Sequence, residues 1–395
     1  MSDPWLSIIG LGEDGPAGLG DASRAALAAA EIVFGGPRHL ALAGVGARGR
    51  PWPVPFSIEP VLAARGRPVA VLASGDPFWH GAGGSLAARL DPAEWRAFPA
   101  PSAFALAAAR LGWRLEETVC LGLHAAPFAR LRPHLAPGAR LLCLLRDGAA
   151  AGELAGWITA QGFGAARLHV MEALGGPRER IRAQRAAAFA LGDVAAPVLA
   201  AVEAAGGPAL PRASGLEDGL FAHDGQITKR PVRALSLSAL APCPGAHLWD
   251  LGAGSGSIAV EWCLAAPGAT ADAVELRPER AANIAANVAA FGLEGRLSVH
   301  EGRAQDALGG LAAPDAVFVG GGADAPLLAA LWDRLAPGVR LVVNAVTLGT
   351  EALLLEWSAR AGGALLRIEL AEAAPLGTLR GWRPARPIVQ WSVTR

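Results

Sequence analysis

A glycine-rich loop in the second half of the chain could hold a small ligand. The stretch Leu248–Glu261 reads LWDLGAGSGSIAVE, in which an apolar strand-like run meets the start of a helix. Glycine permits tight turns and lets a ligand approach the backbone without a Cβ in the way. The helix that follows offers unpaired N–H groups at its start. The loop consists of Gly252, Ala253, Gly254, Ser255 and Gly256.

Two acidic residues indicate what kind of ligand this loop holds. Asp250 precedes the loop, and Glu275 ends the next expected strand. A carboxylate beside the loop would repel a pyrophosphate but attract an ammonium group, while Glu275 could accept both hydroxyls of a ribose. The glycine spacing also departs from the dinucleotide fingerprint, because Ser257 stands where the third glycine would be. These features favour S-adenosylmethionine over a dinucleotide or a turn without a ligand.

The first half of the chain contains three corners at which a strand-like run leads into a loop. One is the loop around Gly10 and Gly12, and another is Gly75–Phe78, which reads GDPF. The third places Ser102 just before the alanine-rich segment Ala103–Leu111. By their residues alone, these are strand–loop–helix corners, and a single G-x-G loop is only weak evidence for a nucleotide-like ligand.

Short strand-like runs alternate with helical segments in both halves, which predicts an α/β protein with parallel sheets. The first half is expected to have helices at Ala22–Ala30, Ser85–Leu90 and Ala103–Leu111. Its expected strands are Leu6–Gly10, Ile32–Gly35, Val69–Ala73, Thr118–Gly122, Arg140–Leu145 and Ala166–Met171.

The second half predicts a doubly wound fold that ends in an antiparallel β tail. Its expected helices are one ending at Ala265, Pro278–Phe291, Ala325–Leu335 and Glu351–Ala361. Its expected strands are His247–Leu251, Thr270–Leu276, Leu297–Glu301, Ala316–Gly320 and Arg340–Val346, then Ala364–Glu372 and Pro387–Val393 as an edge hairpin.

The length of 395 residues predicts two to three domains. Residues 206–223 are rich in glycine, proline and acidic residues, and we interpret them as a linker. This division gives a first domain at 1–205 and a second at 224–395.

Composition excludes several classes of protein. Because 35 basic and 35 acidic residues balance, binding of nucleic acid by bulk charge is not expected. No apolar run is long enough for a membrane span, and the N-terminus does not resemble a signal peptide. The four cysteines are scattered without a CxxC pair, so we expect no metal site and a cytoplasmic location. They are Cys120, Cys143, Cys243 and Cys263.

The second half resembles the decarboxylating methyltransferase domain of corrin biosynthesis, from about Asp224 to the C-terminus. The resemblance rests on GQITKRPVRALSLSAL before the glycine loop, and on VELRPERAANIAANVAAFG, HEGRAQDAL and DAVFVGGG after it. It implies that Thr228, the glycine loop, Glu275 and Ala304 bind S-adenosylmethionine, and that Gly321 faces the substrate. Arg303 departs from the family, which often has Asp there.

The first half resembles the tetrapyrrole methylase family from about Trp5 to Ala201, through IIGLGEDG, VLASGDPFWHGAG and PAPSAFALAAARLGW. The family has a two-lobed α/β fold. The resemblance implies that Gly10 and Gly12 face the tetrapyrrole, although Glu13-Asp14-Gly15 replaces a common proline. It also implies a second S-adenosylmethionine site that includes Gly75, Asp76, Pro77, Phe78 and Ser102.

Together the resemblances imply a two-domain enzyme that binds one S-adenosylmethionine per domain. It would methylate precorrin-6Y at C5 and C15 and remove the ring C acetate carboxylate, giving precorrin-8X in cobalamin biosynthesis. A sulfonium methyl is already electrophilic, so no nucleophilic side chain is needed, and we assign no catalytic residue.

Arginines are the natural partners of a substrate with many carboxylates. Arg380 and Arg383, with Arg386, are the stronger candidates, and the set from Arg178 to Arg185 is more simply a solvated face. His80 and His247 are expected to be structural. A homo-oligomer is expected. The alternatives are an NAD(P)-dependent reductase and a single-site methyltransferase with one degenerate domain.

Overall fold

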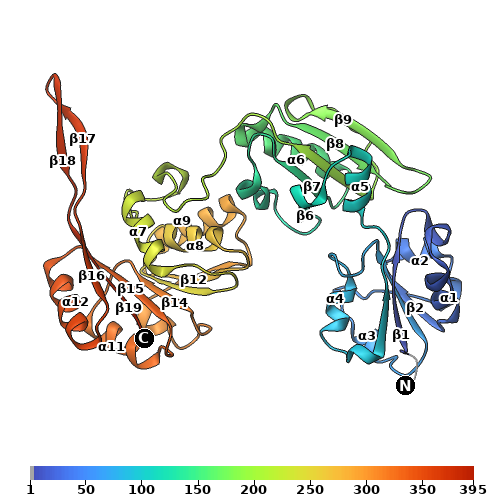
Figure 1. Ribbon diagram of the computed structural model, residues 1–395, viewed down its shortest axis with the longest axis horizontal. Helices are drawn as coiled ribbons and strands as arrows, with labels where there is room; N and C mark the ends of the chain where they lie inside the picture. Colours follow the sequence, from blue (N-terminus) through green and yellow to red (C-terminus); the bar gives the residue numbers. More distant parts are fainter. Residues whose placement is uncertain (1–3) are drawn as a thin grey trace. The chain divides into compact units, whose positions relative to one another are not determined.

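The computed structural model describes residues 4–395 and divides into two compact units (Figure 1). Unit 1 extends to residue 209, apart from residues 129–133, and unit 2 comprises Ala129–Pro133 and Leu210–Arg395. Within the described residues, no helix has the length and apolarity to cross a membrane.

The first sheet of unit 1 is parallel throughout, in the order β3-β2-β4-β1-β5. Ile8 and Ile9 on an interior strand are fully buried on opposite faces, which explains why consecutive residues of this strand are apolar. The strands are β1 (Leu6–Leu11), β2 (Ile32–Gly35), β3 (Gly49–Pro51), β4 (Val69–Ser74) and β5 (Trp95–Phe98). The helices are α1 (Asp21–Ala29), α2 (Pro37–Ala43), α3 (Glu59–Leu62) and α4 (Ala82–Ala87).

The second sheet of unit 1 is mixed, and the expectation of parallel sheets is wrong here. Its order is β6-β7-β10-β8-β9, and only the β6–β7 pair is parallel. A short connection without a crossover helix joins β8 to β9, which permits only antiparallel pairing. The strands are β6 (Val119–Gly122), β7 (Arg140–Leu144), β8 (Arg167–Glu172), β9 (Arg180–Arg185) and β10 (Val198–Glu203). Its helices are α5 (Ala103–Leu111) and α6 (Ala149–Ile158).

Unit 2 has a seven-stranded sheet in the order β13-β12-β11-β14-β15-β19-β16. The first five of these strands are parallel, and β19 and β16 are antiparallel, as the sequence predicts. The strands are β11 (His247–Leu251), β12 (Thr270–Glu275), β13 (Leu297–Glu301), β14 (Ala316–Val319), β15 (Arg340–Ala345), β16 (Ala364–Ile368) and β19 (Ile388–Thr394). The helices are α7 (Arg230–Leu240), α8 (Ser257–Ala265), α9 (Pro278–Phe291), α10 (Ala304–Ala307), α11 (Ala325–Arg334) and α12 (Leu348–Ala361).

The expected tail strand Ala364–Glu372 is wrong in extent. It ends at Ile368, and a separate antiparallel pair follows, β17 (Ala371–Leu376) and β18 (Leu379–Pro384). Figure 1 shows this pair as a long ribbon that extends away from the sheet of unit 2. Its side chains are mostly exposed, so the burial that would mark its strands in the sequence is missing.

The second part of the expected linker is an integral part of unit 2. Leu216 and Phe221 are buried in its core. The backbone nitrogens of Gly215 and Leu216 donate to the carboxylate of Glu261 at 2.6 and 2.9 Å. The same carboxylate accepts a hydrogen bond from Nε of Arg233, whose side chain is fully buried. Arg233 therefore ties this segment to α8.

Candidate functional site

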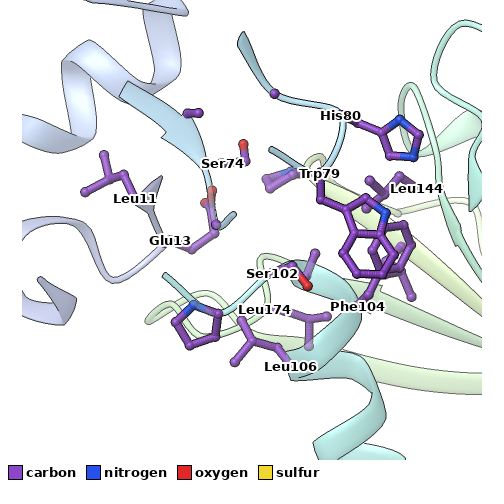
Figure 2. A pocket seen from close by; sticks show the side chains of 18 of the residues that line it. Leu11, Glu13, Ser74, Trp79, His80, Ser102, Phe104, Leu106, Leu144 and Leu174 are labelled. Atoms are coloured by element: carbon purple, nitrogen blue, oxygen red, sulfur yellow. The ribbon is translucent and has the colours of Figure 1, made fainter. Parts of the chain in front are cut away.

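Unit 1 contains a cavity of about 390 Å³ at the carboxyl ends of its strands. Most of its lining is apolar, and Figure 2 shows Trp79, His80 and Leu144 across the cavity from Leu11 and Glu13. Other lining residues include Gly12, Arg38, His39, Ser74, Gly75, Ser102, Phe104, Leu106, His124, Met171, Leu174 and Pro197.

Close backbone packing shapes one wall of this cavity. Gly75 has φ +55°, and a Cβ there would stand 2.7 Å from Cα of Ser102. A Cβ on Gly10 would stand 1.8 Å from the carbonyl oxygen of Gly75. Ser102 caps α5 by accepting a hydrogen bond from the nitrogen of Ala105 at 3.1 Å. Only glycine fits at Gly10 and Gly75, because larger residues would push the loops apart.

A group of polar side chains also lines this cavity. Arg38 pairs with Glu13 and donates to Ser74 Oγ at 2.9 Å. His39 Nε2 lies 2.8 Å from the same Ser74 oxygen. Burial, with a smaller effect of the Arg38 charge, lowers the pKa of His39 to about 4. His39 is therefore neutral at physiological pH, and Arg38 is the cation of this group.

Unit 2 contains a cavity of about 300 Å³ at the carboxyl edge of its sheet. The loops after β11, β12, β13 and β14 all contribute to it, as the parallel topology requires. The lining residues are Gly252, Val274, Glu275, Leu276, Arg277, Arg280, Gly302, Arg303, Ala304, Gln305, Gly321, Gly322, Asp324 and Leu327.

The residues of this cavity fit the ribose end of an adenosyl group. Glu275 is 5% exposed, and its two carboxylate oxygens accept hydrogen bonds from the nitrogens of Gly254 at 2.8 Å and Arg277 at 3.0 Å. A carboxylate oxygen has two acceptor sites, so capacity is left for ligand hydroxyls. Gly252 has φ +68°, and a Cβ there would stand 2.4 Å from the carbonyl oxygen of Gly321. The cavity floor therefore requires glycine at this point.

Asp250, which precedes the glycine loop, is buried beneath it. Its side chain is fully buried, does not line the cavity, and accepts a hydrogen bond from the nitrogen of Ala259 at 3.1 Å. Burial is the main cause that raises its pKa to about 7. Its other carboxyl oxygen, Oδ1, is buried without a hydrogen-bond partner among the described residues.

Both units match known families. Residues 6–190 match the Tetrapyrrole (Corrin/Porphyrin) Methylases, and residues 219–395 match the Precorrin methyltransferase domain. The precorrin-6Y C(5,15)-methyltransferase (decarboxylating) of a Sinorhizobium species is 51% identical over 400 residues, which are 99% of this chain and 97% of that protein. The chain belongs to this family.

Two further relatives match about half of the chain. The cobalt-precorrin-6B C(15)-methyltransferase (decarboxylating) of Salmonella typhimurium is 32% identical, and the match covers 44% of this chain and 92% of that protein. The crystal structure of the C-terminal domain of precorrin-6Y C5,15-methyltransferase from Rhodobacter capsulatus is 51% identical, with a TM-score of 0.46, over 47% of this chain and 100% of that chain.

Family membership confirms the fold class and the methyltransferase activity that the sequence resemblances imply. S-adenosylmethionine is the methyl donor of such enzymes, and a precorrin is the kind of substrate that the family implies.

The structure brings some of the expected residues of unit 1 to its cavity. Gly12, Gly75 and Ser102 line it, whereas Gly10, Asp76, Pro77 and Phe78 do not. Asp76 accepts a hydrogen bond from the nitrogen of Phe78 at 2.9 Å. The ring of Phe78 packs against Trp95, with ring centroids 5.6 Å apart. These two side chains shape the loop rather than the cavity wall.

In unit 2 as well, only some of the expected site residues line the cavity. Gly252, Glu275, Ala304 and Gly321 line the cavity. Ala253, Gly254, Ser255, Gly256 and Thr228 do not, although Gly254 binds Glu275 and Thr228 accepts a hydrogen bond from Arg233 through its carbonyl.

The expected substrate arginines Arg380 and Arg383 lie on β18, outside the cavity of unit 2. Arg380 donates to the carbonyl of Ala373 at 3.0 Å, and Arg383 lies 3.7 Å from Glu372. In unit 1, Arg180 and Arg182 both pair with Glu172 and Asp193, so their charges are already balanced.

Sequence reasoning missed cavity residues whose neighbours in space are distant in sequence. In unit 1 these are Arg38, His39 and His124, which follow β2 and β6. In unit 2, Arg277 and Arg280 line the cavity at the start of α9. Their position just after Glu275 was a usable signal, because residues that follow a parallel strand gather at the same sheet edge.

Proposed function

We propose that this chain methylates precorrin-6Y at C5 and C15 and removes the carboxylate of the ring C acetate, giving precorrin-8X. The observation that carries the proposal is the 51% identity to a precorrin-6Y C(5,15)-methyltransferase (decarboxylating) across nearly the whole of both chains. The two cavities support it, because each lies at strand ends, where the loops that follow parallel strands form ligand sites.

The residues of the chain align the reactants and exclude water. Bound S-adenosylmethionine would supply a methyl group that nucleophilic carbon can attack directly. In unit 2, Glu275 and the loop at Gly252 would hold the adenosyl part, and Ala304 with Leu327 would offer an apolar surface to the base. In unit 1, the apolar wall of Phe104, Leu106 and Leu144 would keep water away from the reacting carbon.

The two units divide the reaction in this proposal. Unit 2 would methylate C15 and support the loss of CO2, which matches the name of the Salmonella typhimurium relative that is about half as long. The conjugated macrocycle would take up the electron pair that the departing carboxylate leaves. Unit 1 would then methylate C5, and each unit would bind its own methyl donor.

A homo-oligomer is part of the proposal. Leu376, Leu379 and Trp382 on the β17–β18 pair are each more than 70% exposed, and such side chains favour burial against another surface. Sedimentation of a variant with these three residues changed to serine tests this, since a smaller assembly is expected.

We also propose a cytoplasmic location, which suits four free cysteines, and action without nucleic acid or a membrane.

Mass spectrometry of the product from precorrin-6Y tests the function. Two added methyl groups and one lost CO2 are expected, and a product with neither would overturn the proposal. Titration with S-adenosylhomocysteine and with NADPH distinguishes the methyltransferase from the reductase alternative. The reductase alternative requires tight binding of NADPH. Binding of S-adenosylhomocysteine at only one site would favour the alternative with one degenerate unit.

A further inference from the structure

His80 in the cavity of unit 1 has an unusual backbone conformation. It lies in the loop after β4 and has φ +59°. Within the described chain, only Ala173 and Ala241 share a positive φ among non-glycine residues. This conformation costs free energy for a side chain with a Cβ, so surrounding contacts must hold it. Figure 2 shows the imidazole of His80 on the side of the cavity that also holds Trp79 and Leu144.

A glycine at the end of β6 leaves space for the imidazole of His80. A Cβ on Gly122 would stand 3.1 Å from Nε2 and 3.2 Å from both Cδ2 and Cε1 of His80. Gly122 does not have a positive φ, so its backbone does not require glycine. The feature that glycine provides here is room for this ring.

A second histidine stands beside the first. The rings of His80 and His124 lie edge to face, with centroids 6.1 Å apart, and both residues line the cavity. Neither ring makes a hydrogen bond or an ion pair with any residue in 4–395. By contrast, His39 bonds Ser74, and His169 bonds Glu203. The nitrogens of His80 and His124 are therefore available to a ligand.

The surroundings of His80 disfavour the charged form of its imidazole. Trp79, Phe104 and Leu144 line the same part of the cavity. Burial is the larger cause that lowers the pKa of His80, and the neighbouring His124 adds to it. The other titratable groups of the lining are Glu13, Arg38 and His39, which bond one another or Ser74.

The chemistry of the proposed function creates a need for such a group. When carbon attacks the sulfonium methyl, a C–C bond forms and the C–S bond breaks, and the donor leaves as a neutral thioether. The macrocycle has then gained a positive charge, and it returns to its original charge by releasing a proton. A neutral imidazole in reach of the reacting carbon can accept that proton.

We propose that His80, seated against Gly122 and beside His124, is the general base that accepts this proton in unit 1. The inference rests on the proposed function, because it assigns a role within the methylation assigned to this unit. The unshared electron pair of one ring nitrogen takes the proton, and the resulting imidazolium releases it to solvent when the product leaves. His124 is a positioning residue that supports the ring of His80.

The most direct test replaces His80 by glycine, which suits the positive φ and leaves a hole the size of the ring. We expect His80→Gly to slow the methylation assigned to unit 1 by about 10²–10⁴-fold, and added imidazole to restore part of the rate. Binding of S-adenosylhomocysteine should stay within about two-fold of the wild type, because a base is not needed to hold the donor. Gly122→Ala should slow the same step by displacing the ring.

A matched control and the pH profile separate a base from a structural residue. His169→Gln changes a hydrogen-bonded histidine of the same unit outside the cavity, and its activity should match the wild type. The wild-type rate should rise with pH until the imidazole is deprotonated, and His80→Gly should lose this rise.

Several outcomes would overturn the assignment. Unchanged methylation in His80→Gly would do so, as would an equal loss of donor binding, which would make His80 a donor contact. If the wild type run in parallel adds no methyl group to precorrin-6Y, the proposed function fails instead. A third outcome would also refute the assignment of His80 as a base. In it, His80→Gly loses activity, added imidazole restores none of it, and the pH profile of the remaining rate matches that of the wild type.

Discussion

A hydrogen bond of 2.8 Å joins the backbone nitrogen of Gly254 to Oε2 of Glu275. It connects the glycine loop after β11 to the end of the neighbouring strand β12, so the position of one depends on the other. The carboxylate therefore has two tasks in the proposed site. It fixes the glycine loop after β11, and in the proposed function it would also accept hydrogen bonds from the methyl donor.

Replacement of Glu275 by alanine should weaken donor binding in unit 2. We expect a loss of about 1–3 kcal/mol, which is typical for hydrogen bonds to a charged group. Calorimetric titration with S-adenosylhomocysteine should show one weakened site, with the site of unit 1 as an internal reference. Glu279→Gln on the exposed side of α9 is the control, and dissociation constants unchanged from wild type in Glu275→Ala would remove this residue from the site.

Gly75→Ala should damage the cavity of unit 1. The new Cβ would stand 2.7 Å from Cα of Ser102, and the positive φ adds about 1–2 kcal/mol of strain. We expect loss of S-adenosylhomocysteine binding at unit 1 with binding at unit 2 intact. Gly84→Ala is the matched control, because Gly84 lies in α4 and its new Cβ would stand within 4 Å of no atom beyond its chain neighbours and the backbone of its own helix. Equal binding by both variants would contradict the packing argument.

Removal of Arg233 should destabilise unit 2 strongly. Arg233→Met leaves Glu261 as a buried carboxylate without its cation, at a cost of about 3–5 kcal/mol in the free energy of unfolding. Hydrogen exchange of full-length protein should show faster exchange in peptides of unit 2 than in those of unit 1. Arg230→Met removes an exposed pair with Glu217 and should change little. Similar exchange in the two variants would mean that the buried pair is not required.

Asp250 should make unit 2 less stable as the pH rises. Its pKa is raised by burial to about 7, above the usual 3.8, so the folded state binds the proton more tightly than the unfolded state. This contribution is fully present below about pH 4 and is lost as the pH rises through about 7. Urea unfolding of the wild type and Asp250→Asn at pH 5 and pH 8 should show a steeper decline in the wild type. Parallel curves would show that Asp250 does not titrate in this range.

Elements that depend on local pattern could be predicted from the order of residues alone. The runs at Ile32–Gly35, His247–Leu251 and Pro278–Phe291 were predicted with their observed bounds, because apolar period and flanking turn residues are local properties. Glu275 and Gly252 were also expected at one sheet edge, and the structure places both in the lining of the unit 2 cavity. Parallel topology requires this, since successive strands end at the same edge.

Contacts between side chains that are far apart in the sequence became evident only in the folded protein. The ring of His80 needs the space at Gly122, and Gly10 packs against Gly75, relationships that no local pattern contains. Asp250 is likewise fully buried and is not part of the cavity lining, while Arg380 and Arg383 lie on an exposed β pair. A sequence records residue types and spacing, whereas accessibility and distance arise only when separate segments pack together.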